Sequence, residues 1–208
     1  MKVTQELLDD LNYLNTSEIK SFCRRHSIPY TIVIETKDGI RKTPDDDRKG
    51  VMLERVRHFL QTGVVLPETR FPAAVVCFDP LPKKLTADGR LFYGQYDKTN
   101  RTMIALLMDL TGGQFKDGAI ARILARKFWS RGKAPTFREY ATEWLHETKG
   151  HTKPSPEAAY LSDRAAKGAI PDWKKLRTAK ASKVMKVLRQ VTAPFSHGSE
   201  SFSADTEP

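Results

Sequence analysis

The sequence predicts a mainly α-helical protein: a helix-loop-helix module with an inserted β-hairpin, then a small three-helix domain and a basic C-terminal helix. Two observations predict this fold class. Apolar residues recur at the spacing of one helix face along most of the chain, and helix-capping patterns precede several of these stretches. The chain of 208 residues is 39% hydrophobic, so it is long enough and apolar enough to bury a core.

The first 62 residues contain three helical stretches, each combining capping residues with an apolar face. These stretches are about 3–13, capped by Thr4, about 15–28, opened by a capping box between Asn15 and Glu18, and about 48–61, preceded by the aspartates at 45–47. The second stretch ends before Pro29, because a residue that precedes proline avoids the helical region. Gly63 ends the third.

The sequence of residues 31–43 predicts a β-hairpin inserted between the second and third helices. Two β-branched runs flank Asp38 and Gly39, a pair that permits the positive φ angles of a tight turn. Pro44 and the aspartates at 45–47 are expected to end the hairpin. These aspartates are also expected to cap the helix that follows, where its positive end favours an acidic side chain.

The rest of the chain divides into four parts by composition. They are a proline-rich linker on the protein surface at 63–98, a small three-helix domain at 99–148, a basic helical arm at 149–192 and a disordered acidic tail at 193–208. Within the arm, a short helix is expected at about 155–167 and a longer one at about 173–191. We therefore expect the N-terminal module, residues 1–62, to be joined to the helical domain by a surface segment.

The charge of the chain makes polyanions the first candidate partners. The formal net charge is +10 and the sequence pI is about 9.6, with 11 basic and 3 acidic residues in the arm at 149–192. The longest apolar run has six residues, against the roughly 20 of a membrane span. Two cysteines are too few for a disulfide framework or a four-cysteine zinc site. We expect a cytoplasmic protein, nucleoid-associated if it binds DNA, with no cofactor and no metal.

A pattern of apolar and basic residues extends over two of the predicted N-terminal helices. The pattern consists of Leu14, Ser17-Glu18-Ile19-Lys20, Cys23-Arg24-Arg25 and Ile28 in the first, and of Lys49, Met52-Leu53, Glu54-Arg55, Val56 and Phe59-Leu60 in the second. This pattern resembles the SAP motif, a helix-loop-helix module typical of DNA-binding and chromatin-associated proteins. The resemblance implies that the module contacts duplex DNA, with the hairpin inserted into the family's loop.

A second resemblance covers residues 85–147. Its residues are Leu85-Thr86, Tyr96-x-Lys98-Thr-Asn100, Gly113-Gln-Phe115-Lys and Lys133-x-x-Thr136, before a helix that ends in Trp144. They look like an uncharacterised bacterial domain found C-terminal to SAP modules. The resemblance implies no activity.

The basic residues of the two SAP-like helices and the hairpin form one candidate phosphate-binding edge. Its members are Lys20, Arg24, Arg25, Arg41, Lys42, Arg48, Lys49 and Arg55. Helix N-termini and basic side chains bind phosphate. The alternative is a solvated helix face, which the aspartates at 45–47 favour because they repel phosphate.

The basic C-terminal helix is a second candidate site. Its candidate residues are Lys174, Lys175, Arg177, Lys180, Lys183 and Lys186. Like charges three and four residues apart destabilise an isolated helix, and an anionic partner would relieve that repulsion. Nucleic acid, a membrane surface and an acidic protein groove are all suitable partners. The alternative is an amphipathic helix packed on the body with its lysines in water.

The sequence contains no convincing combination of residues for a catalytic site. Cys23 and His26 lie three apart on one helix, but on its apolar face, where a cysteine is normally inert core. His146 and His151 lack a third metal ligand at sensible spacing. We therefore predict a non-enzymatic nucleic-acid-binding protein that contacts duplex DNA through its phosphates. The alternatives are an adaptor that docks an acidic protein partner and an enzyme that acts on nucleic acid with Mg²⁺ or Mn²⁺.

Overall fold

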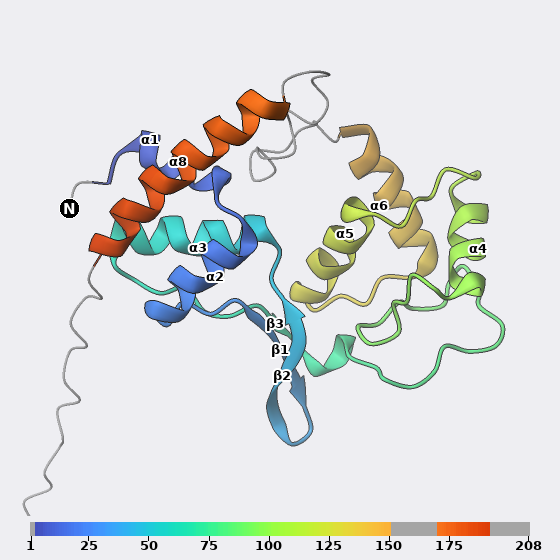
Figure 1. Cartoon of the computed structure of the whole chain (residues 1–208). Helices are drawn as coiled ribbons and strands as arrows, with labels where there is room; N and C mark the ends of the chain where they lie inside the picture. The colour runs from blue at the N-terminus through green and yellow to red at the C-terminus, as the bar shows by residue number, and fades with distance from the viewer. Residues whose placement is uncertain (1–2, 151–169, 192–208) are drawn as a thin grey trace, which may run out of the picture.

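The computed structural model describes residues 3–150 and 170–191, and within them the fold is mainly α, as the sequence predicts (Figure 1). The elements in chain order are α1 (Gln5–Asp10), η1 (Leu11–Tyr13), α2 (Thr16–Arg25), β1 (Thr31–Thr36), β2 (Gly39–Asp46), α3 (Lys49–Thr62), β3 (Arg70–Phe71), η2 (Ala73–Val75), α4 (Arg101–Leu110), α5 (Ala119–Ser130), α6 (Phe137–Gly150) and α8 (Ile170–Gln190). Here η denotes a single turn of 3₁₀-helix.

Local capping chemistry begins several helices where the sequence predicts. The Asn15 side chain accepts a hydrogen bond from the Glu18 backbone at 2.8 Å, and the Glu18 carboxylate accepts one from the Asn15 backbone at 2.7 Å. Thr136 and Glu139 form the same reciprocal pair before α6, at 2.8 and 3.1 Å. Each pair satisfies backbone donors that a helix start leaves without an intrahelical partner.

The three strands form one small sheet in the order β2-β1-β3. Strand β1 pairs antiparallel with β2, and Thr36 lies opposite Gly39 across the turn. Gly39 adopts φ +112°, a backbone conformation that is strained for residues with a side chain. Strand β3 then pairs parallel with β1, so the segment after α3 returns to the sheet.

The start of α3 differs from the prediction. Strand β2 continues through Pro44 to Asp46, and the N-cap residue of α3 is Arg48, with no side-chain cap. The expectation that the aspartates at 45–47 cap this helix is therefore wrong. Their carboxylates bond instead to side chains of other segments, as described below.

One core joins the first three helices to the last. Buried apolar side chains of α1, η1, α2 and α3 pack with Ala181, Val184 and Leu188 of α8. Figure 1 shows α8, in red, lying across these N-terminal helices. The basic C-terminal helix therefore packs on the body of the protein, and its apolar stripe is part of the N-terminal core.

A second core joins the sheet to α4, α5 and α6. Strand β1 contributes Ile32 and Ile34, although the sequence assigns the hairpin to the N-terminal module. The segment at 63–98 contributes Phe71, Val75 and Leu91, each fully buried. The segment predicted as a linker or cover over its neighbours therefore also contributes side chains to their core.

Two predicted features, the short helix at about 155–167 and the tail at 193–208, lie outside the described residues. Over the ranges that are described, no helix combines the length and the apolar character needed to cross a lipid bilayer.

Candidate nucleic-acid interface

The basic residues of α2 have different surroundings. Lys20 forms an ion pair with Asp46 of β2. Arg24 and Arg25 are exposed, and Arg24 donates a long hydrogen bond to the hydroxyl of Tyr30 at 3.5 Å. Of the predicted cations on this helix, two therefore remain at the surface.

The hairpin carries two further predicted residues in an exposed position. Arg41 and Lys42 are adjacent on β2, and both side chains are exposed. Neither forms an ion pair with a carboxylate within residues 3–150 and 170–191. These two cations are therefore available to an external anion.

The beginning of α3 holds Arg48 and Lys49, which are both half-buried. Lys49 donates a hydrogen bond to the carbonyl oxygen of Asn12 at 2.6 Å, which connects α3 to η1. Burial lowers the pKa of Arg48, and the nearby guanidinium groups of Arg126 and Arg122 lower it further. The Nε atom of Arg48 is buried and has no hydrogen-bond partner in the described part of the chain.

Arg55 lies inside the protein, contrary to its predicted place on an exposed basic edge. The residue is 5% exposed, and its guanidinium pairs with the buried carboxylate of Asp47. It also donates hydrogen bonds to the carbonyl oxygens of Pro67 at 3.0 Å and Pro29 at 3.2 Å, and to the hydroxyl of Thr69 at 2.9 Å. Arg55 cannot contact phosphate from this position, so its role is to join four segments.

Some of the basic residues of α8 form ion pairs within the protein. Three of them form ion pairs with acidic residues of α1 and α2: Arg177 with Glu18 at 2.6 Å, Lys180 with Asp10 at 2.5 Å and Lys183 with Glu6 at 2.6 Å. Lys175 and Lys186 are exposed, and the side chain of Lys174 lies outside the described residues. The repulsion expected along this helix is therefore relieved by the protein's own carboxylates.

The predicted cations do not form one continuous surface. Figure 1 places the hairpin on the side of the N-terminal helices opposite to α8. The residues of α8 that remain exposed are thus separated from Arg41 and Lys42. Of the two candidate sites, the hairpin borders a larger cavity than the one beside Lys183 of α8.

This cavity lies between the hairpin and the second core and has a volume of about 560 Å³. Five basic and two acidic residues line it, so its charge is positive. Arg41 and Lys42 contribute from the hairpin, Lys98 from the loop before α4 and Arg122 from α5. Pockets that bind small molecules have volumes of about 300–1,000 Å³, a range that includes this cavity.

Both acidic side chains of the cleft are oriented by contacts within the protein. Asp45 accepts hydrogen bonds from Arg126 at 3.2 Å and from the Tyr93 hydroxyl at 2.9 Å. Asp97 accepts hydrogen bonds from the backbone and hydroxyl of Thr99, at 2.8 and 2.7 Å. Burial and the bond to Asp45 raise the pKa of Tyr93 to about 12, so its hydroxyl stays a donor at neutral pH.

Two arginines of α5 are site residues that the sequence prediction omits. Arg126 also donates to the carbonyl oxygen of Asp46 at 2.7 Å and so fixes α5 against the hairpin. Arg122 lies one turn earlier on the same helix and is exposed. Their spacing of four residues places both on one face of a helix, but only the tertiary structure brings that face to the hairpin.

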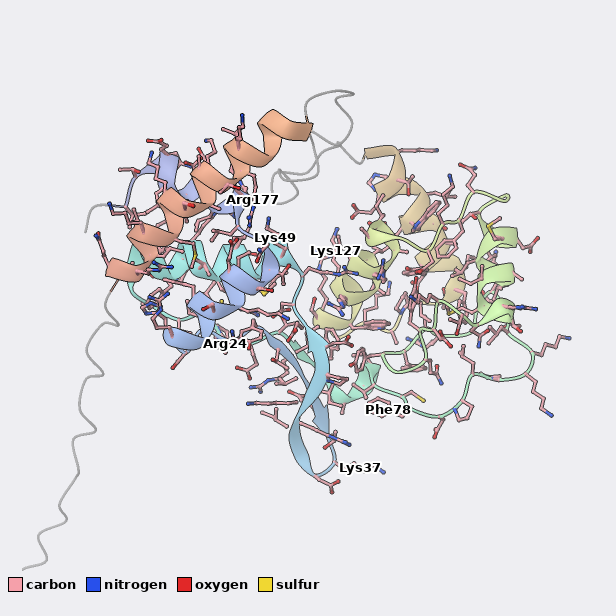
Figure 2. The ribbon with its side chains drawn as sticks, viewed as in Figure 1. Arg24, Lys37, Lys49, Phe78, Lys127 and Arg177 are labelled. Atoms are coloured by element: carbon pink, nitrogen blue, oxygen red, sulfur yellow. The ribbon has the colours of Figure 1, made fainter. Side chains whose placement is uncertain are left out.

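The cleft also has an aromatic wall. Tyr93 and Trp129 are nearly buried, with ring centroids 5.5 Å apart, whereas Phe78 is 63% exposed. Figure 2 shows Phe78 beside the hairpin, whose tip carries Lys37. The sequence prediction also omits Phe78, since nothing in the local pattern distinguishes it from a core residue.

Cys23 and His26 are both buried, and neither is activated. Burial raises the pKa of the Cys23 thiol to about 11, and burial lowers the pKa of His26. The imidazole lies between the rings of Phe22 and Phe59, with centroids 4.3 and 5.2 Å away. A thiolate–imidazolium pair needs shifts in the opposite directions, so this pair is poorly suited to nucleophilic chemistry.

Across residues 3–150 and 170–191, no group of three or more His, Cys, Asp and Glu side chains is arranged to hold a metal ion. Comparison of the chain with protein-family models, with curated proteins and with solved structures finds no match.

Proposed function

We propose that this chain is a non-enzymatic nucleic-acid-binding protein that contacts the backbone phosphates of duplex DNA. One observation carries the proposal. Four cations from three separate segments converge on one cleft: Arg41, Lys42, Lys98 and Arg122. None of them forms an ion pair with a carboxylate in the described part of the chain.

The electrostatics of the cleft favour an anionic ligand. Cations held near one another repel, and the crowding of Arg48 by Arg122 and Arg126 is an example of this repulsion. Bound phosphate would relieve it, and basic side chains around a cleft attract polyanions at long range. The net charge of +10 acts in the same direction.

The hairpin has a suitable shape for this role. It extends beyond the helices as a two-stranded ribbon with Lys37 at its tip (Figure 2). A ribbon of this kind fits the major groove of B-DNA, where it brings side chains close to the phosphates on both sides. The contacts proposed are to phosphate, so they position the protein without specifying a sequence.

Helix α8 has a smaller part in this proposal than the sequence predicts. Arg177, Lys180 and Lys183 are engaged with carboxylates of α1 and α2. The exposed side chains of Lys175 and Lys186 add to the long-range field of the protein.

The test is fluorescence anisotropy of the full chain on a labelled duplex of about 25 base pairs, titrated at several salt concentrations. Phosphate contacts make log K fall linearly with log salt, with a slope of about −0.9 per phosphate. Removing two contacts in the double variant Arg41→Ala/Lys42→Ala should therefore reduce the slope by about 2.

The matched control is Lys83→Ala/Lys84→Ala. This variant also removes two adjacent exposed cations, but neither lines the cleft. It should retain most of the wild-type slope. Equal effects of the two variants would show that only net charge matters and would contradict a role for the cleft.

The alternative is an adaptor that docks an acidic protein partner. The same titration separates the two functions, because binding to a duplex should be strongest at low salt. If the full chain fails to bind the duplex at low salt, the proposed function is wrong and the cations serve a protein partner.

A further inference from the structure

Phe78 is the aromatic side chain of the cleft that is most exposed. Its ring meets that of Tyr93 edge to face, with centroids 6.2 Å apart, and the residue as a whole is 63% exposed. By contrast, Tyr93 and Trp129 are 8% and 4% exposed. The exposed ring of Phe78 is therefore the part of the aromatic wall that can contact a ligand.

The position of Phe78 depends on a glycine. Gly94 has φ +94°, and a Cβ atom added to it would lie 2.8 Å from Cδ1 of the Phe78 ring and would also meet the carbonyl oxygen of Cys77. Any other residue at 94 would displace the ring or the backbone before it. Glycine at position 94 therefore leaves the space that the Phe78 ring occupies beside the cavity.

The cavity that Phe78 lines is also lined by cations. Arg41 and Lys42 lie on the hairpin side of the cavity, and Arg122 lies on α5. A ligand with a flat apolar ring and a phosphate would match both parts of the site. Base stacking on an aromatic side chain together with a positively charged groove is the usual way in which proteins bind single-stranded nucleic acid.

We propose that the cleft binds an unpaired nucleotide unit, with its base stacked on Phe78 and its phosphate against Arg41, Lys42 and Arg122. The proposal rests on the proposed function, because the same cations serve both. A duplex keeps its bases stacked inside, so the site would select strand ends, overhangs or single strands.

The experiment compares two single-stranded probes with the full chain. One is a labelled ten-residue oligothymidylate, and the other is an abasic oligonucleotide with the same number of phosphates. Stacking of one base is worth enough to make wild type bind the oligothymidylate at least about five-fold more tightly. Phe78→Ala should lose this preference and retain its binding to the 25-base-pair duplex.

Phe78→Tyr is the matched control, because it keeps the ring and should retain the preference. Thymidine monophosphate is the competitor that identifies the source of the nucleotide. Displacement of the oligothymidylate at millimolar competitor supports a site for free nucleotides, and persistence of the complex supports a site for a strand.

These experiments distinguish failure of the stacking site from failure of the proposed function. Equal affinity of wild type for the two single-stranded probes, with duplex binding intact, overturns the stacking site and leaves the proposed function standing. Absence of binding to every probe at low salt overturns both.

Discussion

Arg55 has the surroundings of a structural residue, since acceptors from three other segments of the chain surround its guanidinium. It pairs with Asp47, which also accepts a hydrogen bond of 2.6 Å from Thr69. A buried charge of this kind is tolerated because its partner and its hydrogen bonds replace water. Loss of the guanidinium would leave the Asp47 carboxylate buried without its counter-ion.

We therefore expect Arg55→Ala to lower the free energy of unfolding by about 3–5 kcal/mol, the usual cost of breaking a buried ion pair. Urea denaturation followed by circular dichroism measures the change. Glu54→Ala is the control, because Glu54 is the exposed neighbour on the same helix. A similar midpoint for the two variants would contradict the structural role of Arg55.

The arginines of α5 show the opposite case. Arg122 and Arg126 share one helix face, yet Arg126 is held by Asp45 and Asp46, whereas Arg122 is exposed at the cleft. Both are arginines on the same face of the same helix, so neither residue type nor helix position distinguishes them. Their roles differ because the hairpin contacts only one of them.

At the scale of elements, α8 is held to α1 and α2 by ion pairs of unequal burial. The side chain of Asp10 is 5% exposed and that of its partner Lys180 is 33% exposed, whereas Lys183 and Glu6 are 62% and 69% exposed. The ammonium group of Lys180 also lies 4.9 Å from the centroid of the Tyr13 ring. Ion pairs in water contribute little, so the pair with Asp10 is the stronger one.

Lys180→Ala should accordingly reduce the free energy of unfolding by about 1–3 kcal/mol, because it leaves the buried Asp10 carboxylate without its donor. Lys183→Ala removes the same kind of side chain from the same helix and should change the unfolding midpoint only slightly. Thermal or urea denaturation compares the two. An equal loss of unfolding free energy in the two variants would contradict a larger contribution from the pair with the buried Asp10 carboxylate.

At the scale of the whole molecule, the protein has two separate cores, and the segments that build them are interleaved in sequence. Helix α8 completes the core of the N-terminal helices, and β1 completes the core of α4, α5 and α6. The hairpin therefore joins both parts, and Arg126 of α5 anchors it from the other side. This arrangement fixes the cleft between the hairpin and α5.

A chain that ends at Gly150 should thus be destabilised in its N-terminal core. It loses Val184 and Leu188, which are fully buried, and burial of two such side chains contributes about 3 kcal/mol or more. Cys23, fully buried in the complete chain, should then react with a thiol reagent. Mass spectrometry after alkylation counts the modified cysteines.

The control for this truncation is a chain that ends at Val191, which keeps α8. It should behave as the complete chain does, with Cys23 protected. If the chain ending at Gly150 protects Cys23 equally well, α8 is not part of the N-terminal core.

Most helix positions, the caps of α1, α2 and α6 and the hairpin turn follow from the sequence alone. Each depends on contacts within about four residues, such as the bonds between Asn15 and Glu18, or on the backbone freedom of Gly39. The net positive charge and the mainly α fold class are likewise properties of composition and local pattern.

Only the tertiary structure decided which cations remain exposed and which face the cleft. Arg177 meets Glu18 across 159 positions of the chain, and Arg126 meets Asp45 across 81. Local patterns carry no information about such distant pairs, because burial and counter-charge depend on how the elements pack. For the same reason Arg55 looked like a surface residue in the sequence, whereas packing buries it.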